Sequence, residues 1–474
     1  ICELHEEPRR YHEEPRRTSD SSSGKSNKMK KKIFIILAVC VIPVLLFAQE
    51  DTTKTKKKNR FNFPVFPVVA YDADMGFQYG IVANMFDYGD YSNYPEYRHA
   101  VKLEVSRFTK GSGVNQLFYD SKYLIPGNIR ITADVSYLTE KALDFYGYNG
   151  YQAIYSPEWE DDEDSAYITR MFYRHERKMF RFTCDFQGNI YEDKLRWLGG
   201  IGFMNFKTGT VDIERLNKGK DEDKILPDTI TLFDQYVDWG IIPEDEKDGG
   251  NANFFKAGLV FDTRDNEPNP MKGLWDEALL VYSPGFFMND GNSFLKLIFI
   301  HRQYFTIVKK KVNLGYRLGY QGTIAGHTPF YFQPYMLSSF STATKTDGLG
   351  GAKNLRGILR NRVVGDGIAW GNVEIRWRIV DFVLAKQNFY VGMNAFCDAG
   401  MVVQEYDIEE DAIDPAVTDE YFDFSYSNDK IHPTVGGGLR IGWNENFIIA
   451  VDYGFALDNK DGLRGLYIAF GNLF

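Results

Sequence analysis

The feature that most constrains this chain is an alternation of apolar and polar residues, which recurs in many segments of ten or more residues. In NIRITADVSY, residues 128–137, every odd-numbered position is apolar or aromatic and every even-numbered position is polar. In KVNLGYRLGYQ, residues 311–321, the even-numbered positions are apolar or aromatic and the odd-numbered positions are polar residues or glycine. A repeat of two residues sends alternate side chains to opposite faces of a β-strand, whereas a helix repeats every ~3.6 residues. We therefore expect an all-β fold.

Segment length and aromatic content favour a membrane barrel over a soluble β-sandwich. A strand crosses a bilayer at a tilt with ~9 to 11 residues, and these segments are that long. Aromatic residues make up 16% of the chain although its mean hydropathy is −0.36. A barrel explains both values, because only every second residue faces lipid and aromatic girdles line both interfaces. A sandwich, the alternative, would have shorter strands and polar outer faces.

Sixteen segments carry the alternation, which predicts a 16-stranded antiparallel transmembrane β-barrel. By this count the long connections 208–250, 323–367 and 403–430 lie outside the cell, and the aromatic and acidic stretch 145–164 lies on the periplasmic side. The expected strands begin near Gly76, Arg98, Val114, Asn128, Ala166, Lys178, Lys194, Phe254, Leu274, Phe294, Val312, Ala369, Phe389, Thr434, Phe447 and Leu463.

The N-terminal part of the chain divides by composition. Residues 1–28 contain HEEPRR twice and a serine-rich run, and we interpret them as a disordered leader or a mistranslated upstream segment. Residues 29–48 combine three lysines, a 15-residue apolar stretch and a final alanine, which is typical of a signal peptide; a retained anchor is the alternative. Residues 49–63 would then be a short periplasmic segment, and residues 64–474 the barrel.

Charge and cysteine content argue against several classes of function. Without residues 1–48 the chain keeps 46 Lys and Arg and 59 Asp and Glu, a formal charge of −13, which argues against a nucleic-acid partner. Cys184 and Cys397 each occupy an apolar position of an alternating segment, so we expect neither a disulfide nor a metal site. The sequence contains no recognised catalytic or phosphate-binding motif, so we expect no enzyme activity and no cofactor.

The segment GGAKNLRGILRNR, residues 350–362, places several basic residues in a glycine-rich loop just before an alternating strand. The next two strands turn Glu374 and Asp398 into the lumen, because their apolar neighbours face outward. Arg356 is the natural cation for these two acids, since its planar fork can bind a carboxylate with two parallel hydrogen bonds. Gly357 would let the backbone pass close to the barrel wall. The alternative is a solvated outer loop whose arginine contacts nothing.

These residues also carry a resemblance to a known family. GG-x-x-x-LRG-I, followed by GNVEIRW and FCDAG, resembles the outer-membrane assembly superfamily, the BamA/TamA-like bacterial surface antigen barrels. The resemblance implies a sixteen-stranded barrel in which an Arg-Gly motif on the sixth external loop packs inside the lumen against acids on strands twelve and thirteen. Ile358 departs from the aromatic residue usual at its place in the family. The matching positions are Leu355, Arg356, Gly357, Ile358, Glu374 and Asp398.

A second stretch, FDTRDNEPNPMKG at residues 261–273, resembles the strand-eight motif of the same family and its following turn. Asp262 and Arg264 fall together on the lumen face. Pro270 and Gly273 supply the turn geometry.

The family resemblance further implies a weak seam between the first and last strands. Here those strands would be residues 76–88 and 465–474, and glycines in them weaken strand packing. The last residues, LYIAFGNLF, are similar to the C-terminal signal by which such barrels are recognised for insertion. The residues assigned to the seam and to this signal are Gly76, Gly80, Gly465, Ile468, Phe470 and Phe474.

The resemblance implies an outer-membrane protein of a Gram-negative bacterium that assists insertion, assembly or translocation of proteins through this seam. A gated pore or secretion conduit plugged by the Arg356 loop is the alternative, and an outer-membrane phospholipase is a third possibility. The expected partners are outer-membrane lipid and β-barrel or secreted client proteins. Residues 49–75 are too few for a polypeptide-transport module, and a separate periplasmic accessory protein that stands in for such modules is a further candidate partner; the sequence does not decide whether one exists.

Overall fold

The computed structural model describes residues 60–92, 97–289, 291–339, 347–384, 387–410, 413–426, 428–443 and 447–474. The predicted leader (1–28) and signal peptide (29–48) lie outside these residues, as does nearly all of the segment 49–63.

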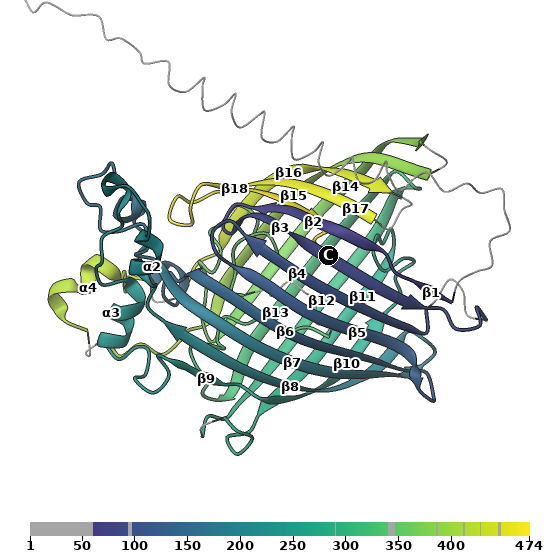
Figure 1. The fold of residues 1–474 in the computed structure, drawn as a ribbon, viewed down its shortest axis with the longest axis horizontal. Helices are drawn as coiled ribbons and strands as arrows, with labels where there is room; N and C mark the ends of the chain where they lie inside the picture. The colour runs from purple at the N-terminus through teal and green to yellow at the C-terminus, as the bar shows by residue number, and fades with distance from the viewer. Residues whose placement is uncertain are drawn as a thin grey trace, which may run out of the picture. The chain divides into compact units, whose positions relative to one another are not determined.

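Sixteen antiparallel strands of the described chain close into a barrel, as predicted (Figure 1). The ring runs from β10 through β18 to β2 and on to β8, and β8 pairs with β10 to complete it. Two short pieces, β1 (Phe61–Asn62) and β9 (Gly249–Asn251), pair with the ends of β3 and β8. The barrel strands are β2 (Val65–Asp72), β3 (Gly76–Asp87), β4 (His99–Phe108), β5 (Gly113–Ile125), β6 (Ile129–Asp144), β7 (Arg174–Tyr191), β8 (Leu195–Gly209), β10 (Phe254–Asp262), β11 (Gly273–Ser283), β12 (Phe294–Val308), β13 (Val312–Gly326), β14 (Gly367–Leu384), β15 (Gln387–Gln404), β16 (His432–Trp443), β17 (Phe447–Ala456) and β18 (Arg464–Phe470).

Helices are few and short. Within the described residues, no helix combines the length and the apolar character needed to cross a bilayer. The α-helices are α2 (Ile213–Asn217), α3 (Leu232–Asp238) and α4 (Pro415–Tyr421), and the 3-10 helices are η1 (Gly150–Gln152), η2 (Pro157–Glu160) and η3 (Glu222–Lys224).

The sequence alternation sorts side chains between lipid and lumen. On β14, Val373 and Trp377 are 49% and 53% exposed on the outer face, whereas Glu374 is fully buried. On β6, Tyr137 points outward while Asp134 and its inward neighbours are buried. Hydrophobic side chains therefore cover the outside of the barrel, and most charged side chains of these strands point inward, where they must be paired.

The barrel begins one strand earlier than the alternation indicated. β2 pairs along its whole length with β3, so the strand that starts at Gly76 is the second and not the first. Sequence reasoning missed β2 because Pro67 lies within it, and a proline without an N–H argues against an interior strand. The structure accommodates Pro67 because the other neighbour of β2 is β18, with which it shares a single aligned pair, Ile468 and Tyr71.

The strand expected to begin at Ala166 was a wrong prediction, since these residues belong to the loop 145–173. The main-chain N–H of Ile168 donates to the Trp159 carbonyl at 2.9 Å, which folds the segment on itself instead of into the sheet. Phe172, whose alternation suggested a strand, is buried against other loops. Relative to the prediction, β2 is an additional strand and the strand at Ala166 is absent, so the total remains sixteen.

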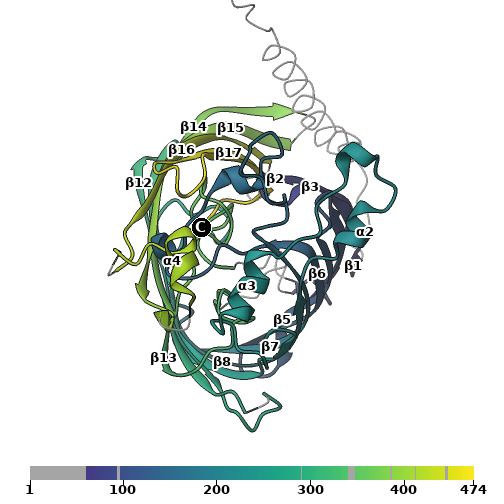
Figure 2. The ribbon, with the colours of Figure 1, turned by 90° about the vertical axis from the view of Figure 1, so that its left-hand side faces the viewer.

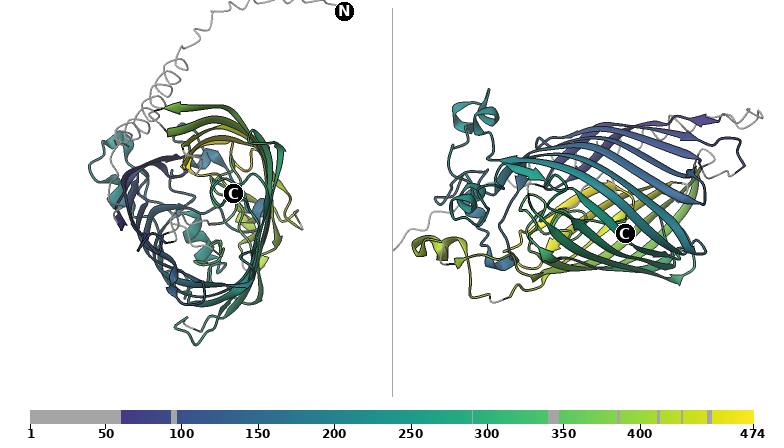
Figure 3. Two further views of the ribbon diagram at one scale, coloured as in Figure 1. Left: turned by 90° about the vertical axis from the view of Figure 1, so that its right-hand side faces the viewer. Right: turned by 90° about the horizontal axis from the view of Figure 1, so that it is seen from below.

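Three long loops leave the same end of the barrel, and the corrected strand count moves 145–173 to this side from the periplasmic side. They are 145–173, 210–253 and 405–431. Together with α2, α3 and α4 they gather at the left of Figure 1 and face the viewer in Figure 2. Short turns join the strands at the opposite end, which faces the viewer in the left part of Figure 3.

Aromatic side chains bind the three long loops to one another. The rings of Tyr148 and Tyr406 stack with centroids 4.2 Å apart, and Phe145 meets Tyr236 edge-on at 5.1 Å. Such ring pairs add about 0.5–1.5 kcal/mol each beyond the area they bury. These loops form an ordered aromatic cap at the end of the barrel with the long connections.

Candidate functional site in the barrel lumen

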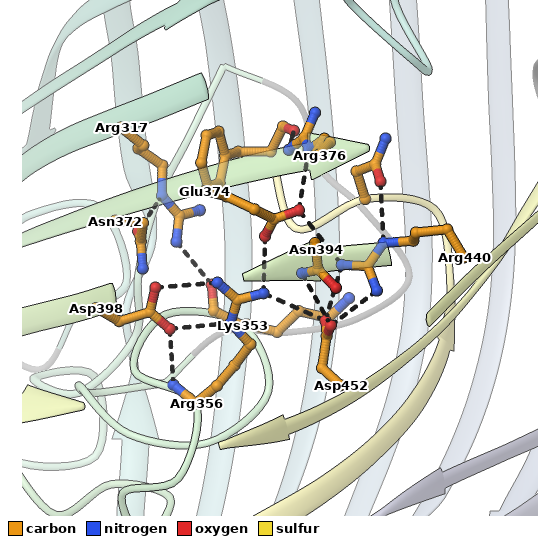
Figure 4. Close-up of polar contacts among 12 residues, drawn as sticks. Arg317, Lys353, Arg356, Asn372, Glu374, Arg376, Asn394, Asp398, Arg440 and Asp452 are labelled. Carbon is orange, nitrogen blue, oxygen red and sulfur yellow. Dashed lines mark hydrogen bonds and ion pairs between the residues drawn. The ribbon is translucent and has the colours of Figure 1, made fainter. Parts of the chain in front are cut away.

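Arg356 lies at the centre of a buried ion cluster inside the barrel (Figure 4). It belongs to the connection between β13 and β14, residues 327–366, called the lumen loop below. Its Nε and Nη2 donate to the two carboxylate oxygens of Asp398 on β15, at 2.9 and 3.0 Å. Its Nη1 donates to Glu374 on β14 at 2.9 Å and to Asp452 on β17 at 3.2 Å. One guanidinium thus joins three strands of the wall.

Two further arginines balance these acids. Arg376 Nε donates to Glu374 at 2.9 Å, and Arg440 Nη1 donates to Asp452 at 2.7 Å. Together with the pair of Arg356 and Asp398, the cluster holds three guanidinium groups and three carboxylates, so their formal charges cancel. Deleting one member of such a buried set leaves a partner's charge uncompensated, which costs about 3–5 kcal/mol.

An aromatic ring completes the environment of the loop arginine. Arg356 Cζ lies 3.4 Å from the ring centroid of Phe396 on β15, within range of a cation–π interaction. Ile358, which departs from the family's aromatic residue, is buried with Leu355 in the hydrophobic core under the lumen loop. The ring that stacks on the arginine therefore comes from the wall and not from the loop.

The turn that presents Arg356 is shaped by Asn354. Its Oδ1 accepts the Gly350 N–H at 2.7 Å, and its Nδ2 donates to the Gly348 carbonyl at 2.6 Å. The backbone at Gly350 has a φ of +123°, a conformation that residues with a side chain rarely adopt. At Gly357 φ is +105°, and the N–H of this residue donates to the Tyr467 hydroxyl of β18 at 3.2 Å.

The lumen loop is also fixed to the strands on the opposite side of the ring. These contacts tie it to β7, β11 and β12, so the loop spans the barrel interior. They are Arg181 Nη1 to the Tyr335 hydroxyl at 2.9 Å, Arg177 Nη2 to Asp347 at 2.7 Å, the Ser339 N–H to Glu277 at 2.9 Å, and Lys296 Nζ to Gln333 at 3.0 Å.

The strand-eight stretch forms a separate, smaller site at the end of β10. Arg264 Nε and Nη2 bind both oxygens of Asp262 at 2.9 and 2.7 Å. Pro270 is buried in the following turn, and its carbonyl accepts a hydrogen bond from Asn313 at 3.1 Å. Gly273 has a φ of +109°, and a Cβ there would collide with the main chain at Thr263. The structure does not bring this site into contact with Arg356.

Comparison with known protein families identifies the family to which the chain belongs. The Omp85 superfamily domain matches residues 98–474, which include the Arg-Gly motif and its acidic partners. The chain belongs to the Omp85 superfamily. This confirms the family resemblance found in the sequence, and it makes the chain a β-barrel of the outer membrane of Gram-negative bacteria.

Two solved structures show the same fold as this Omp85 barrel. BamA from Haemophilus ducreyi lacking POTRA domains 1–3 is 13% identical with a TM-score of 0.52, covering 89% of this chain and 74% of that one. CdiB from Escherichia coli is 11% identical with a TM-score of 0.51, covering 88% of this chain and 64% of that one. A search of the curated proteins gives no match.

The first and last strands of this Omp85 barrel, where a seam was expected, are β2 and β18, which pair with each other. The predicted seam residues Gly76 and Gly80 are not at it, because they stand on β3, which pairs with β2 and with β4. Ile468 is at it, as the one residue of β18 aligned with β2. Gly465 is aligned with Gly454 on the other side of β18. The missed proline-containing strand explains this correction.

The end of the Omp85 chain turns into the barrel. Phe470 closes β18 and is exposed on its outer face, as a C-terminal signal would require. Phe474 instead is 9% exposed, and Arg376 Nη2 donates to its main-chain oxygen at 2.7 Å. The chain end is marked inside the ring in Figure 2 and in the left part of Figure 3. The aromatic side chain of Phe474 therefore belongs to the lumen.

Sequence reasoning missed the third acid and the two balancing arginines. Asp452 sits in FIIAVDYGFA, residues 447–456, where its apolar neighbours already indicated a lumen position. Arg440 occupies the equivalent place on β16. Because every inward-facing charge of a barrel needs a partner, Asp452 and the two arginines could have been grouped as candidates. The alternation alone does not show which residues of neighbouring strands are aligned.

Proposed function

We propose that this Omp85 barrel assists insertion, assembly or translocation of polypeptides at the outer membrane by opening between β2 and β18. One observation carries the proposal. β17 and β18 are aligned from Ile449 to Phe455, whereas β18 and β2 share the single pair of Ile468 and Tyr71. Unpaired N–H and C=O groups along such an edge can pair with a strand of another polypeptide. No bond is made or broken, so the proposed role is not that of an enzyme.

The lumen cluster supports this role by fixing one side of the seam. Arg356 holds β14, β15 and β17 to the lumen loop, and Tyr467 ties β18 to Gly357. Among the described residues, the strand pairing of β2 consists of its hairpin with β3 and a single aligned pair with β18. Separation at this line therefore breaks fewer backbone hydrogen bonds than separation between the other strands.

A disulfide across the seam tests the proposal. Tyr71→Cys with Ile468→Cys, in a chain whose own cysteines (Cys2, Cys40, Cys184 and Cys397) are replaced by alanine, would link β2 to β18. The matched control is Val451→Cys with Ile468→Cys, which links β17 to β18 at an aligned pair. We measure folding of a small, urea-unfolded outer-membrane barrel into liposomes that carry each variant.

The expected result is that the oxidised seam link abolishes the acceleration of client folding, that a reductant restores it, and that the control link has no effect. Equal acceleration by the oxidised seam variant and its control would reject the seam mechanism.

A second candidate is a conduit gated by the lumen loop. It is favoured by the way this loop crosses the interior and binds strands on both sides of the ring. Deleting residues 350–362 would then raise conductance in planar bilayers, while the seam link would leave conductance unchanged. If the oxidised seam link abolishes the acceleration of client folding, the result favours the seam mechanism over the gated conduit.

A further inference from the structure

The lumen contains a cavity that the seam mechanism does not use. About 600 Å³ of space lies between the lumen loop and the barrel end with the short turns. The loop contributes Met336 and Lys353 to its walls, and the turn after β10 contributes Glu267. Sites that bind sizeable ligands typically span about 300–1,000 Å³.

The walls of this cavity are strongly basic. Seven cationic side chains line it against one acidic side chain, Glu267. Five of the seven pair at 2.7–3.3 Å with Glu104, Asp120, Asp262 or Glu277, so the field that low-dielectric walls concentrate on an anion comes mainly from the other two. The cationic residues are Lys102, Arg130, Arg196, Arg264, Arg302, Arg317 and Lys353.

Two of these cations form no ion pair with a carboxylate in the part of the chain that the structure describes. Arg317 is 8% exposed and hydrogen-bonds only neutral groups, the Asn372 amide at 2.8 Å and the Lys353 carbonyl at 3.0 Å. Among the described residues, neither Arg317 nor Lys353 has an acid within ion-pair distance. A buried guanidinium without a counter-charge is costly, and an incoming anion would remove that cost.

A third arginine offers a free donor beside an aromatic surface. Arg302 is 6% exposed, and within the described chain its buried Nε has no hydrogen-bond partner. Its guanidinium stacks on Trp275 at 3.8 Å, and Arg264 stacks on the same ring at 4.0 Å. The two guanidinium groups cover the Trp275 ring and are held in place by it, so the cavity gains from Arg302 a positioned Nε–H donor for an anion.

The chain's own last residues line one side of the cavity and are held there by arginines beside it. Asn472, Leu473 and Phe474 line the cavity. Arg376 Nη2 donates to the Phe474 main-chain oxygen at 2.7 Å, and Arg440 Nε donates to the Asn472 side-chain oxygen at 3.3 Å. A peptide segment already lies along one side of the space, where the Phe474 ring centroid is 5.3 Å from Arg317 Cζ.

From these observations we infer that the cavity binds a stretch of polypeptide rich in Asp or Glu, with its carboxylates at Arg317, Lys353 and Arg302. This inference rests on the proposed function, because it names a feature of the polypeptides on which the barrel acts. A single phosphate would satisfy the same donors but would leave most of the volume unused.

Binding of labelled peptides to the full chain in detergent tests the inference. One fluorescein-labelled ten-residue peptide carries five glutamates alternating with apolar residues, and its match carries five glutamines. The variant Arg317→Gln with Lys353→Gln removes the unpaired cations. Lys309→Gln with Lys311→Gln is the control, because it removes the same charge from an exposed turn at the same end of the barrel.

We expect the glutamate peptide to bind at least about tenfold more tightly than the glutamine peptide, with the preference lost in the cavity variant and kept in the control. Should the cavity variant not fold, Lys353→Gln alone, on the half-buried loop position, should still weaken binding. Equal binding of both peptides, unchanged binding by the cavity variant, or full competition by equimolar inorganic phosphate would overturn the inference.

The peptide assay is independent of the seam. The oxidised Tyr71→Cys and Ile468→Cys variant is expected to bind the glutamate peptide as the parent chain does while failing to fold clients. If the oxidised link blocks client folding but the two peptides bind equally well, only the cavity inference is rejected. If the glutamate peptide binds more tightly but the link leaves client folding unaffected, only the seam mechanism is rejected.

Discussion

A Cβ atom on Gly357 of the lumen loop would lie 2.7 Å from the carbonyl carbon of Gly454 on β17. The loop backbone therefore rests directly on the wall backbone, and a side chain on either residue would separate them. This approach places the neighbouring Arg356 within reach of Asp398 and Asp452. Two glycines from distant parts of the sequence thus set the depth at which the arginine sits.

Gly357→Ala is expected to lift the loop from β17 and weaken the ion cluster. The added Cβ clashes with the wall, and the φ of +105° costs a residue with a side chain roughly a further 1–2 kcal/mol. Gly454→Ala should have a similar effect from the opposite side. The midpoint of heat-induced unfolding, followed by gel migration of the folded barrel, measures both.

Gly209→Ala is the matched control for this pair. A Cβ on Gly209 has no described atom within 4 Å, and its φ lies outside the left-handed region. We expect its unfolding midpoint to equal that of the parent chain. A Gly357→Ala barrel as heat-resistant as the Gly209→Ala barrel would contradict the close approach.

Arg356→Ala is expected to destabilise the barrel by about 3–5 kcal/mol, because it leaves buried carboxylates without their cation. The double variant with Asp398→Ala should lose less than the sum of the two single variants, since it removes a charge of each sign. Denaturant or heat unfolding of the four chains of this cycle gives the coupling.

The exposed Arg170→Ala serves as control for charge removal. Arg170 pairs with Asp162 in the aromatic cap, but its side chain is 54% exposed, and such pairs contribute about 0–1 kcal/mol. A loss for Arg356→Ala no greater than that for Arg170→Ala, or strict additivity in the cycle, would show that the lumen cluster does not stabilise the barrel.

The link between the loop 210–253 and the lumen loop is expected to depend on pH. His327 Nε2 lies 2.7 Å from Glu246, and this hydrogen bond holds the pKa of the imidazole above its ordinary value of 6.5. A raised folded-state pKa gives stabilisation that is complete below about 6.5 and is lost as pH rises through the raised value.

His327→Gln should therefore lower the unfolding midpoint more at pH 6 than at pH 9, because the charged fraction of the parent imidazole falls as pH rises. Glu246 also accepts the Phe330 N–H at 2.8 Å, and this bond persists at both pH values. A deficit of the same size at pH 6 and pH 9 would show that the charge of His327 plays no part.

The face of each lumen residue could be predicted from the sequence wherever a strand alternates without interruption. Glu374 and Asp398 point inward because their neighbours Val373 and Cys397 are exposed on the outer face. The Arg-Gly motif then indicated its own partners, because two inward acids require a cation. These conclusions needed only the period of two and the cost of burying an unpaired charge.

The sequence could not predict what depends on register or on loop packing. β2 was missed because Pro67 counts against a strand, although a sparsely paired neighbour allows it. The segment from Ala166 was wrongly predicted to be a strand. Aromatic residues that pack in the aromatic cap alternate with polar residues in the same way as aromatic residues that face lipid. Asp452 lies 96 residues from Arg356 along the chain, and no local rule connects them.

The most direct test of the account is backbone hydrogen exchange of the intact barrel in lipid nanodiscs. With one aligned pair to β18, the amides of β2 (Val65–Asp72) should exchange much faster than those of β17 (Phe447–Ala456), and the oxidised link between positions 71 and 468 should slow them. Exchange in β2 as slow as in β17 before the link is formed would contradict a seam that opens.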